Sequence, residues 1–421
     1  MRKEIDALEL NETWTLERLP PGVKALGSKW VYRLKFNSDG TLERYKARLV
    51  AFGNHQKEGV DFSETFASVA KLQTVRTLLG VASVKNWELH QMDVHNAFLH
   101  GDLDEDIYMK PPPGFLPADP SLVCKLKKYI YGLRQAPRCW FSKLSTALLD
   151  YGFVRSHKDN SLFTYRRGGV VLHVLVYVDD LIVCGADSAV LKSFKAYLSH
   201  CFKMKDIGML KYFLGIEVAR GPDGIFLLQR KYCLDIIDEC GLSGSCPVDT
   251  PMEQNHTLLD SKSVPYSDPA QYHRLVGRLV CLLHTRPELS YVVNILAQFM
   301  QTPLLDHWNA AQRLVRYLKS SPGQGVVLSS TTPLQVNAYC DSDFNKDPSS
   351  RRSLTSYIVM LGDSPLQWKT KKQSRVSLSS AEAEYRAMAM TCTELLWLKE
   401  VLQFLGIANP QPKLIHNQMF L

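Results

Sequence analysis

The tetrad Tyr177-Val178-Asp179-Asp180, set between two apolar runs, constrains this chain more than any other feature of its sequence. The runs, Val170 to Val176 and Leu181 to Cys184, are rich in β-branched residues, which predicts a two-stranded hairpin with paired carboxylates at its tip. Two like charges about 4 Å apart repel by roughly 4 kcal/mol at an effective dielectric constant near 20. A shared divalent cation would remove this repulsion, whereas an isolated Asp-Asp pair is more often a solvated turn.

A third carboxylate lies upstream, at the end of another expected strand. Residues 87–94 read Trp-Glu-Leu-His-Gln-Met-Asp-Val, a short strand ending at Asp93, and His95 to Leu99 are expected to begin a helix. Together with Asp179 and Asp180, Asp93 would complete a carboxylate set of the kind that holds two cations for in-line phosphoryl transfer. We therefore expect two Mg²⁺ (or Mn²⁺) ions at this site.

Several ordered sequence blocks carry a resemblance to a known family. Residues 91–102 and 131–137 (Tyr-Gly-Leu-Arg-Gln-Ala-Pro), together with the Tyr-Val-Asp-Asp tetrad, resemble the reverse transcriptase of copia-type LTR retrotransposons. Four further blocks match the same family in its order: residues 29–32, 44–51, 64–66 and 112–115. Ser68 and Glu288 replace the proline and aspartate that are usual in the family, and neither is a catalytic position.

The resemblance implies an α+β fold. It consists of a right-hand polymerase (fingers, palm and thumb), a connection region and an incomplete ribonuclease H-like α/β domain. We expect fingers and palm in residues 1–205, a primer-grip hairpin and thumb in 206–250, a linker and helical connection in 251–330, and the ribonuclease H-like domain in 331–421. Because the family's protease and integrase regions are absent, we expect a fragment of a Pol polyprotein, truncated at both ends.

Composition limits the class of protein and its partners. The 421 residues allow two or three domains, and a hydrophobic fraction of 45% is that of a soluble protein. Ten cysteines without a Cys-x-x-Cys pair, and no signal peptide, predict an intracellular, cytoplasmic or nuclear, protein that is not secreted. No apolar run approaches the ~20 residues of a membrane span, so no membrane partner is expected. The net charge of +8 suits a polyanion. The resemblance implies an RNA template, a DNA primer, an RNA–DNA hybrid and deoxynucleoside triphosphates as partners.

The resemblance assigns Asp93, Asp179 and Asp180 as catalytic residues and metal ligands. It also implies that the main-chain amides of Asn96 and Ala97, at a helix start, hold the triphosphate, as a helix N-terminus can. The alternative for these two residues is an ordinary helix start.

Five other residues are expected to bind the nucleotide. Phe98 would collide with a 2′-hydroxyl and so select deoxynucleotides, although a phenylalanine in an apolar helix is usually core. Lys46 and Arg48 would clamp the β and γ phosphates, or be solvated strand residues. Tyr131 and Gly132 resemble the floor of the nucleotide pocket, where glycine permits close approach and tyrosine offers a stacking face.

The C-terminal residues resemble ribonuclease H. Asp341, at the end of an expected strand, and Glu382, at the start of a long helix, match its first two metal carboxylates. Ser379 to Glu382 also fit a helix capping box, an alternative role for Glu382. We expect the helix to bury a face containing Tyr385, Met388, Cys392, Leu395, Leu398 and Leu402. His416 stands where the family has its third carboxylate, so we expect ribonuclease H activity to be lost.

The sequence thus predicts an RNA-directed DNA polymerase that uses metal ions to transfer deoxynucleotides to a primer 3′ end. The alternative is a catalytically silent retroelement relic that only binds primer–template. A template-independent nucleotidyltransferase fits less well, because it leaves the thumb-like and ribonuclease-like segments unexplained.

Overall fold

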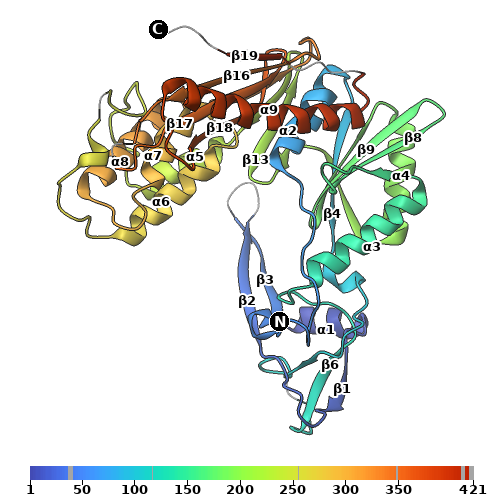
Figure 1. The fold of residues 1–421 in the computed structure, drawn as a ribbon. Helices are drawn as coiled ribbons and strands as arrows, with labels where there is room; N and C mark the ends of the chain where they lie inside the picture. The colour runs from blue at the N-terminus through green and yellow to red at the C-terminus, as the bar shows by residue number, and fades with distance from the viewer. Residues whose placement is uncertain (37–40, 116, 255, 348, 409–412, 417–421) are drawn as a thin grey trace. The chain divides into compact units, whose positions relative to one another are not determined.

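The computed structural model describes residues 1–36, 41–115, 117–254, 256–347, 349–408 and 413–416. The chain has a mixed α/β fold, as expected (Figure 1). It divides into two compact units. The first, here the N-terminal unit, comprises Met1–Ala70, His90–Val183 and Asp187–Gly208. The second, the C-terminal unit, comprises Lys71–Leu89, Cys184–Ala186 and Met209–Leu421.

A six-stranded sheet forms the centre of the N-terminal unit. Its strand order is β11-β4-β10-β9-β8-β7. The bounds are β4 Glu88–Val94, β7 Val154–Arg155, β8 Leu162–Arg167, β9 Val170–Tyr177, β10 Asp180–Gly185 and β11 Met204–Met209. Strands β9 and β10 are the expected hairpin around the tetrad. Since β4 pairs with β10, the sheet brings Asp93 beside the tip of that hairpin.

Two helices, α3 (Ala136–Tyr151) and α4 (Ser188–Cys201), pack on this sheet through a shared core. Trp140 and Leu144 of α3 and Phe194 of α4 lie in this core with Val174 and Leu181 of the hairpin strands. Helix α4 begins at an N-cap, Asp187, whose carboxylate accepts the amide hydrogens of Ala189 and Val190, as capping residues do. Aromatic and aliphatic side chains of the two helices therefore pack against the strands of the hairpin.

The rest of the N-terminal unit surrounds a second core. A hairpin of β2 (Ser28–Phe36) and β3 (Leu42–Ala51) and a sheet ordered β1-β6-β5 contribute to it. The remaining bounds are β1 Trp14–Arg18, β5 Tyr108–Met109, β6 Leu122–Leu126, α1 Arg2–Leu10, and the 3₁₀ turns η1 Gly53–His55 and η2 Ala97–His100. Leu8 of α1 and Leu49 of β3 are both buried in this core, which holds α1 near β3.

The C-terminal unit begins with helix α2 (Leu72–Val84) and a four-stranded sheet. The sheet order is β12-β13-β14-β15, with bounds β12 Tyr212–Phe213, β13 Ile216–Gly221, β14 Gly224–Leu228 and β15 Gly325–Ser329. Strand β15, antiparallel to β14, lies next to the expected domain boundary at residue 330. The sequence did not predict this strand, because glycine and serine flank its short apolar centre, Val326 to Leu328.

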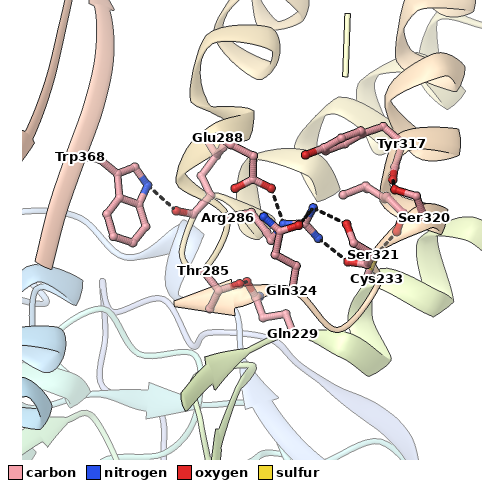
Figure 2. Close-up of polar contacts among 12 residues, drawn as sticks. Gln229, Cys233, Thr285, Arg286, Glu288, Tyr317, Ser320, Ser321, Gln324 and Trp368 are labelled. Carbon is pink, nitrogen blue, oxygen red and sulfur yellow. Dashed lines mark hydrogen bonds and ion pairs between the residues drawn. The ribbon is translucent and has the colours of Figure 1, made fainter. Parts of the chain in front are cut away.

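Four helices form a bundle in the same unit: α5 Arg230–Glu239, α6 Pro269–Leu282, α7 Ser290–Ala297 and α8 Leu305–Ser320. Short 3₁₀ turns, η3 Leu258–Asp260 and η4 Pro287–Leu289, lie between them. Arg286, only 1% exposed, donates to Glu288 at 2.5 Å and to the Ser321 carbonyl at 2.9 Å (Figure 2). The glutamate therefore neutralises a buried guanidinium, and removing one partner of such a pair typically costs about 3–5 kcal/mol.

The last sheet has the order β18-β17-β16-β19, with β19 parallel to β16. Its bounds are β16 Val336–Asp343, β17 Leu354–Leu361, β18 Ser364–Lys372 and β19 Lys413–His416. Helix α9 (Ser380–Phe404) buries Ala383, Ala387 and Thr391, whereas Tyr385 is 71% exposed. Tyr385 and the exposed Cys392 were wrongly expected in the buried face. Small side chains occupy the contact in the first half of the helix, whereas Leu395, Leu398 and Leu402 are buried as expected.

No helix among the described residues is long and apolar enough to cross a membrane.

Candidate active site

The hairpin tip is fixed by two hydrogen bonds to consecutive carbonyl groups. The Trp140 indole N–H donates to the Val178 carbonyl at 2.7 Å, and the Val94 amide donates to the Asp179 carbonyl at 3.0 Å. Val178 itself has a positive φ of 56°. Because Val94 directly follows Asp93, the second bond places the end of β4 against the turn that carries Asp179.

The three carboxylates at the tip, those of Asp93, Asp179 and Asp180, influence one another. Burial raises the pKa of Asp179, and the Asp93 charge raises it further. Burial also raises the pKa of Asp180, with contributions from Asp179 and Asp93, while Gln91, whose amide donates to Asp180 Oδ1 at 3.2 Å, lowers it. Mutual repulsion of this kind is relieved when a cation binds. Among the described residues, however, no three His, Cys, Asp or Glu side chains converge closely enough to hold a metal ion as they stand.

This electrostatic strain has a consequence for stability. The pKa of Asp179 is raised in the folded protein, so the folded state binds a proton at this carboxyl more tightly than the unfolded state does. The stability gained from this proton is complete below the unfolded-state pKa and is lost as the pH rises through the folded-state pKa. We therefore expect Asp179→Asn to raise the thermal unfolding midpoint at pH 7 in EDTA. The difference should disappear below about pH 3, where an aspartate of the unfolded chain, with a pKa of about 3.9, is largely protonated.

Asp206 supplies a control of opposite sign for this stability measurement. Burial raises its pKa, but Lys195, which donates to it at 2.8 Å, and the Gly208 amide lower it to a greater extent. Asp206→Asn should therefore lower the unfolding midpoint at pH 7. A midpoint for Asp179→Asn equal to or below that of the unchanged chain would show that the tip is not strained.

Next to the tip the side chains of Arg48, Tyr131 and Phe98 lie in contact with one another in that order. The Arg48 guanidinium lies 4.2 Å from the Tyr131 ring centre, a cation–π distance. Tyr131 in turn meets Phe98 edge to face, with ring centres 4.9 Å apart. Burial raises the pKa of Tyr131 to about 12, and Arg48, Asp179 and Asp93 also act on it. Phe98, half-buried, thus packs on Tyr131 as well as on the core.

Two polar atoms of these three side chains are buried without a hydrogen-bond partner: Arg48 Nε and the Tyr131 hydroxyl oxygen. A buried donor without a partner typically costs about 1–3 kcal/mol, so such groups are usually satisfied by a ligand, an ion or water. Both are of the kind that can meet phosphate or sugar oxygens. These orphaned atoms support a binding site for a polar ligand beside the three carboxylates.

Lys46 shares a face of β3 with Arg48, since alternate residues of a strand point the same way. Both cations act on Asp179, lowering its pKa against the effect of burial. Asn96 and Ala97 lie at the start of η2, which is a four-residue 3₁₀ turn and not the expected α-helix. Asn96 is left-handed there, with φ 51°, and so short a turn has little macrodipole to offer a phosphate.

Gly132 has a φ of 97° and lies against β3. A Cβ atom at this position would overlap the Ala51 carbonyl oxygen and lie 2.7 Å from Val50 Cγ1. The Ala51 amide also donates to the Tyr131 carbonyl at 2.8 Å. Close backbone approach at Gly132 is therefore what places Tyr131 under Arg48.

The sequence interpretation missed three residues of this site: Glu4, Gln91 and Trp140. Glu4 lies on α1; burial raises its pKa, which Arg48 and Lys46 lower. Its helix is anchored by the buried Ile5 and Leu8. Gln91 could have been found, because it lies two residues before Asp93 on β4 and so shares a face of the strand with it. No local pattern marks Glu4 or Trp140, because both reach the site through packing between distant segments.

The ribonuclease-like carboxylates have different surroundings. Asp341 is exposed within β16, whereas the carboxylate of Glu382 accepts the Leu378 amide and two bonds from Arg386. Its own amide donates to Ser379 Oγ at 3.1 Å, so Ser379 caps the helix as anticipated. The reciprocal bond of a capping box is not formed, because the Glu382 carboxylate accepts from the Leu378 amide and not from that of Ser379. The backbone of His416 pairs in register with Cys340, next to Asp341. The adjacent Asn417 and Gln418 lie outside the described residues.

The site thus combines an acidic hairpin tip with a cationic and aromatic cluster in a mixed α/β unit. The chain belongs to the family described as reverse transcriptase (RNA-dependent DNA polymerase), whose model matches residues 11–254. The match includes Lys46, Arg48, Asp93 and the Asp179-Asp180 tip.

Curated relatives place the chain more narrowly. It is 46% identical over 418 residues to the Retrovirus-related Pol polyprotein from transposon RE2 of Arabidopsis thaliana, covering 99% of this chain and 29% of that protein. The corresponding protein from transposon RE1 of the same plant is 44% identical, covering 99% and 28%. That from transposon TNT 1-94 of Nicotiana tabacum is 36% identical, covering 97% and 31%. The expected likeness to copia-type Pol polyproteins is confirmed, and the chain spans about three tenths of the length of these relatives.

Proposed function

We propose that this chain is an RNA-directed DNA polymerase that extends a primer with deoxynucleotides on an RNA template. The observation that carries the proposal is the contact of Arg48 with Tyr131, both of which, together with Lys46, lie close enough to the acidic tip for their charges and that of Asp179 to act on one another. Such a cluster would offer positive charge to a triphosphate and carboxylates to the cations that the triphosphate carries.

Asp93 and Asp179, with Asp180, are the residues that would hold Mg²⁺ or Mn²⁺, for which oxygen ligands are suited. Two bound ions would supply activation of the primer 3′-hydroxyl and neutralisation of the leaving pyrophosphate. Gln91 orients the Asp180 carboxylate through its hydrogen bond. Arg48, stacked on Tyr131, presents its orphaned Nε to a phosphate oxygen, and Lys46 adds a second positive charge.

The finer architecture is part of the same proposal. We assign fingers to the β2–β3 hairpin, the palm to the six-stranded sheet, the primer grip and thumb to β12, β13, β14 and α5, and the connection to α6, α7 and α8. The support is the order of these elements along the chain. Template, primer and hybrid would then be the partners, consistent with a basic chain.

A silent relic that only binds primer–template is the second candidate, favoured by the carboxylates' failure to converge on one point among the described residues. Incorporation of dTMP on poly(rA)/oligo(dT), with binding of the same duplex measured in parallel, separates the two candidates. Binding with extension supports the polymerase, and binding without extension supports the relic.

Phe98 supplies a test of sugar selection. We expect Phe98→Val to raise the use of ribonucleotides relative to deoxynucleotides at least about tenfold, because a smaller side chain relieves a clash worth ~1.4 kcal/mol. The measurement is the ratio of kcat/KM for the two sugars on one template. Phe141→Val, a change in the same core, is the control, and an unchanged ratio for Phe98→Val would leave Phe98 a core residue.

We also propose that the ribonuclease H-like residues do not cleave the RNA of an RNA–DNA hybrid. The Leu378 amide and Arg386 occupy the Glu382 carboxylate, and the strand beside Asp341 carries His416 where the family has a carboxylate. A labelled hybrid incubated with Mg²⁺ or Mn²⁺ should stay intact, also after His416→Asp alone. Cleavage by the unchanged chain that Asp341→Asn abolishes would contradict this proposal.

A further inference from the structure

Val178, the residue before the catalytic pair, adopts a conformation that its side chain disfavours. Its φ of 56° lies in the left-handed region, and among the described residues it is the one β-branched residue with positive φ. The other non-glycine residues with a positive φ are not β-branched: Glu12, Asn86, Asn96, Leu214, Asn345 and Arg351. A non-glycine residue held there costs on the order of 1–3 kcal/mol and persists only where its surroundings hold it. Some neighbouring group must therefore oppose relaxation of this turn.

Trp140 is placed to do so. Its side chain is 1% exposed on α3 and packs edge to face on Phe202, with ring centres 5.1 Å apart. From this fixed position the indole N–H reaches the Val178 carbonyl at 2.7 Å. The next carbonyl, that of Asp179, is held from another element by the Val94 amide. The two consecutive peptides that flank Asp179 are thus each held by one hydrogen bond, the Val178–Asp179 peptide by Trp140 and the Asp179–Asp180 peptide by Val94.

We propose that Trp140 is a positioning residue, whose indole N–H keeps Val178 left-handed and thereby directs the Asp179 and Asp180 carboxylates toward Asp93. This inference rests on the proposed function for its catalytic readout. Without the N–H, rotation of the Val178–Asp179 peptide relieves the strain at Val178 and moves the Asp179 carboxylate. Trp140 touches no reacting atom, so its loss should act on turnover and metal affinity and spare the binding of primer–template.

The test combines Trp140→Phe, which keeps a buried ring and removes the N–H, with Val178→Gly, which removes the conformational penalty. We expect Trp140→Phe to lower kcat about tenfold or more and to weaken Mn²⁺ binding, titrated by electron paramagnetic resonance without nucleotide, severalfold. The KM for primer–template should stay within about twofold. In the Val178→Gly chain the same Trp140→Phe change should alter kcat and Mn²⁺ affinity by less than about twofold.

Trp30→Phe is the matched control, because Trp30 also donates its indole N–H to a carbonyl, that of Pro113, at 2.9 Å. It should leave kcat and Mn²⁺ affinity unchanged. The proposal is overturned if Trp140→Phe leaves both quantities intact, if its effect is as large in the Val178→Gly chain, or if it lowers kcat and duplex binding together with the unfolding midpoint. An unchanged chain that extends no primer would refute the proposed function, and Mn²⁺ affinity would then decide the role of Trp140 by itself.

Discussion

Replacing Asp93 or Asp179 with asparagine is expected to abolish Mg²⁺-dependent primer extension, lowering the rate by several factors of ten. Each substitution removes a negative charge from the residues proposed to hold the cations, and each lost factor of ten corresponds to about 1.4 kcal/mol of transition-state stabilisation. Binding of primer–template should stay within a few-fold, because basic surfaces hold nucleic acid. Extension assays and filter binding on the same preparations measure the two effects.

Asp150→Asn, at an exposed position near the end of α3, is the control and should extend primers normally. The assignment fails if either variant at the tip retains more than about a tenth of the rate. A parallel loss of duplex binding would indicate misfolding, although Asp179→Asn is expected to be the more thermally stable chain at pH 7. Lower activity with higher stability is the result that distinguishes a strained functional site from a structural one.

Gly132→Ala is expected to have the second largest effect. The new Cβ would overlap the Ala51 carbonyl oxygen and would force an alanine to a φ of 97°. Overlap with backbone atoms cannot be relieved by a rotamer change, so we expect a loss of about 2 kcal/mol or more in stability. Since Tyr131 would shift from beneath Arg48, extension should also fall at least about tenfold.

Gly169→Ala separates the two causes. Gly169 has a similar φ of 82° in the turn between β8 and β9, but a Cβ there meets nothing within 4 Å. It therefore reports the conformational penalty alone and should leave extension unchanged. Equal effects of the two alanines on stability, with extension retained in both, would show that close approach at Gly132 does not determine the position of Tyr131. Chemical denaturation and steady-state kinetics provide the readouts.

Local patterns were sufficient to predict most of the secondary structure. Alternating and β-branched runs predicted β9 and β10, and apolar spacing predicted α8, expected at residues 306–319 and found at Leu305–Ser320. The acidic tip could be recognised because Asp179 and Asp180 are adjacent in the sequence. Asp93 could be added because it ends a strand, and strand pairing then brought it to the tip.

What the sequence could not predict depends on packing between distant segments. The left-handed Val178 is held by Trp140, 38 positions away, and a valine in a turn gives no local signal for positive φ. Glu4 approaches Arg48 because Leu8 and Leu49 share a core. In α9 the small residues Ala383 and Ala387 are buried, whereas the hydrophobic pattern had predicted Tyr385 in the buried face.

Primer extension by the unchanged chain on poly(rA)/oligo(dT) tests the central claim most directly. We predict stepwise addition of dTMP with Mg²⁺ or Mn²⁺, none with EDTA, and none with the Asp179→Asn chain under the same conditions. Fluorescence anisotropy with the labelled duplex should show binding by both chains. A folded chain that binds the duplex and adds no nucleotide with either cation would contradict the claim and leave a protein that binds primer–template without copying it.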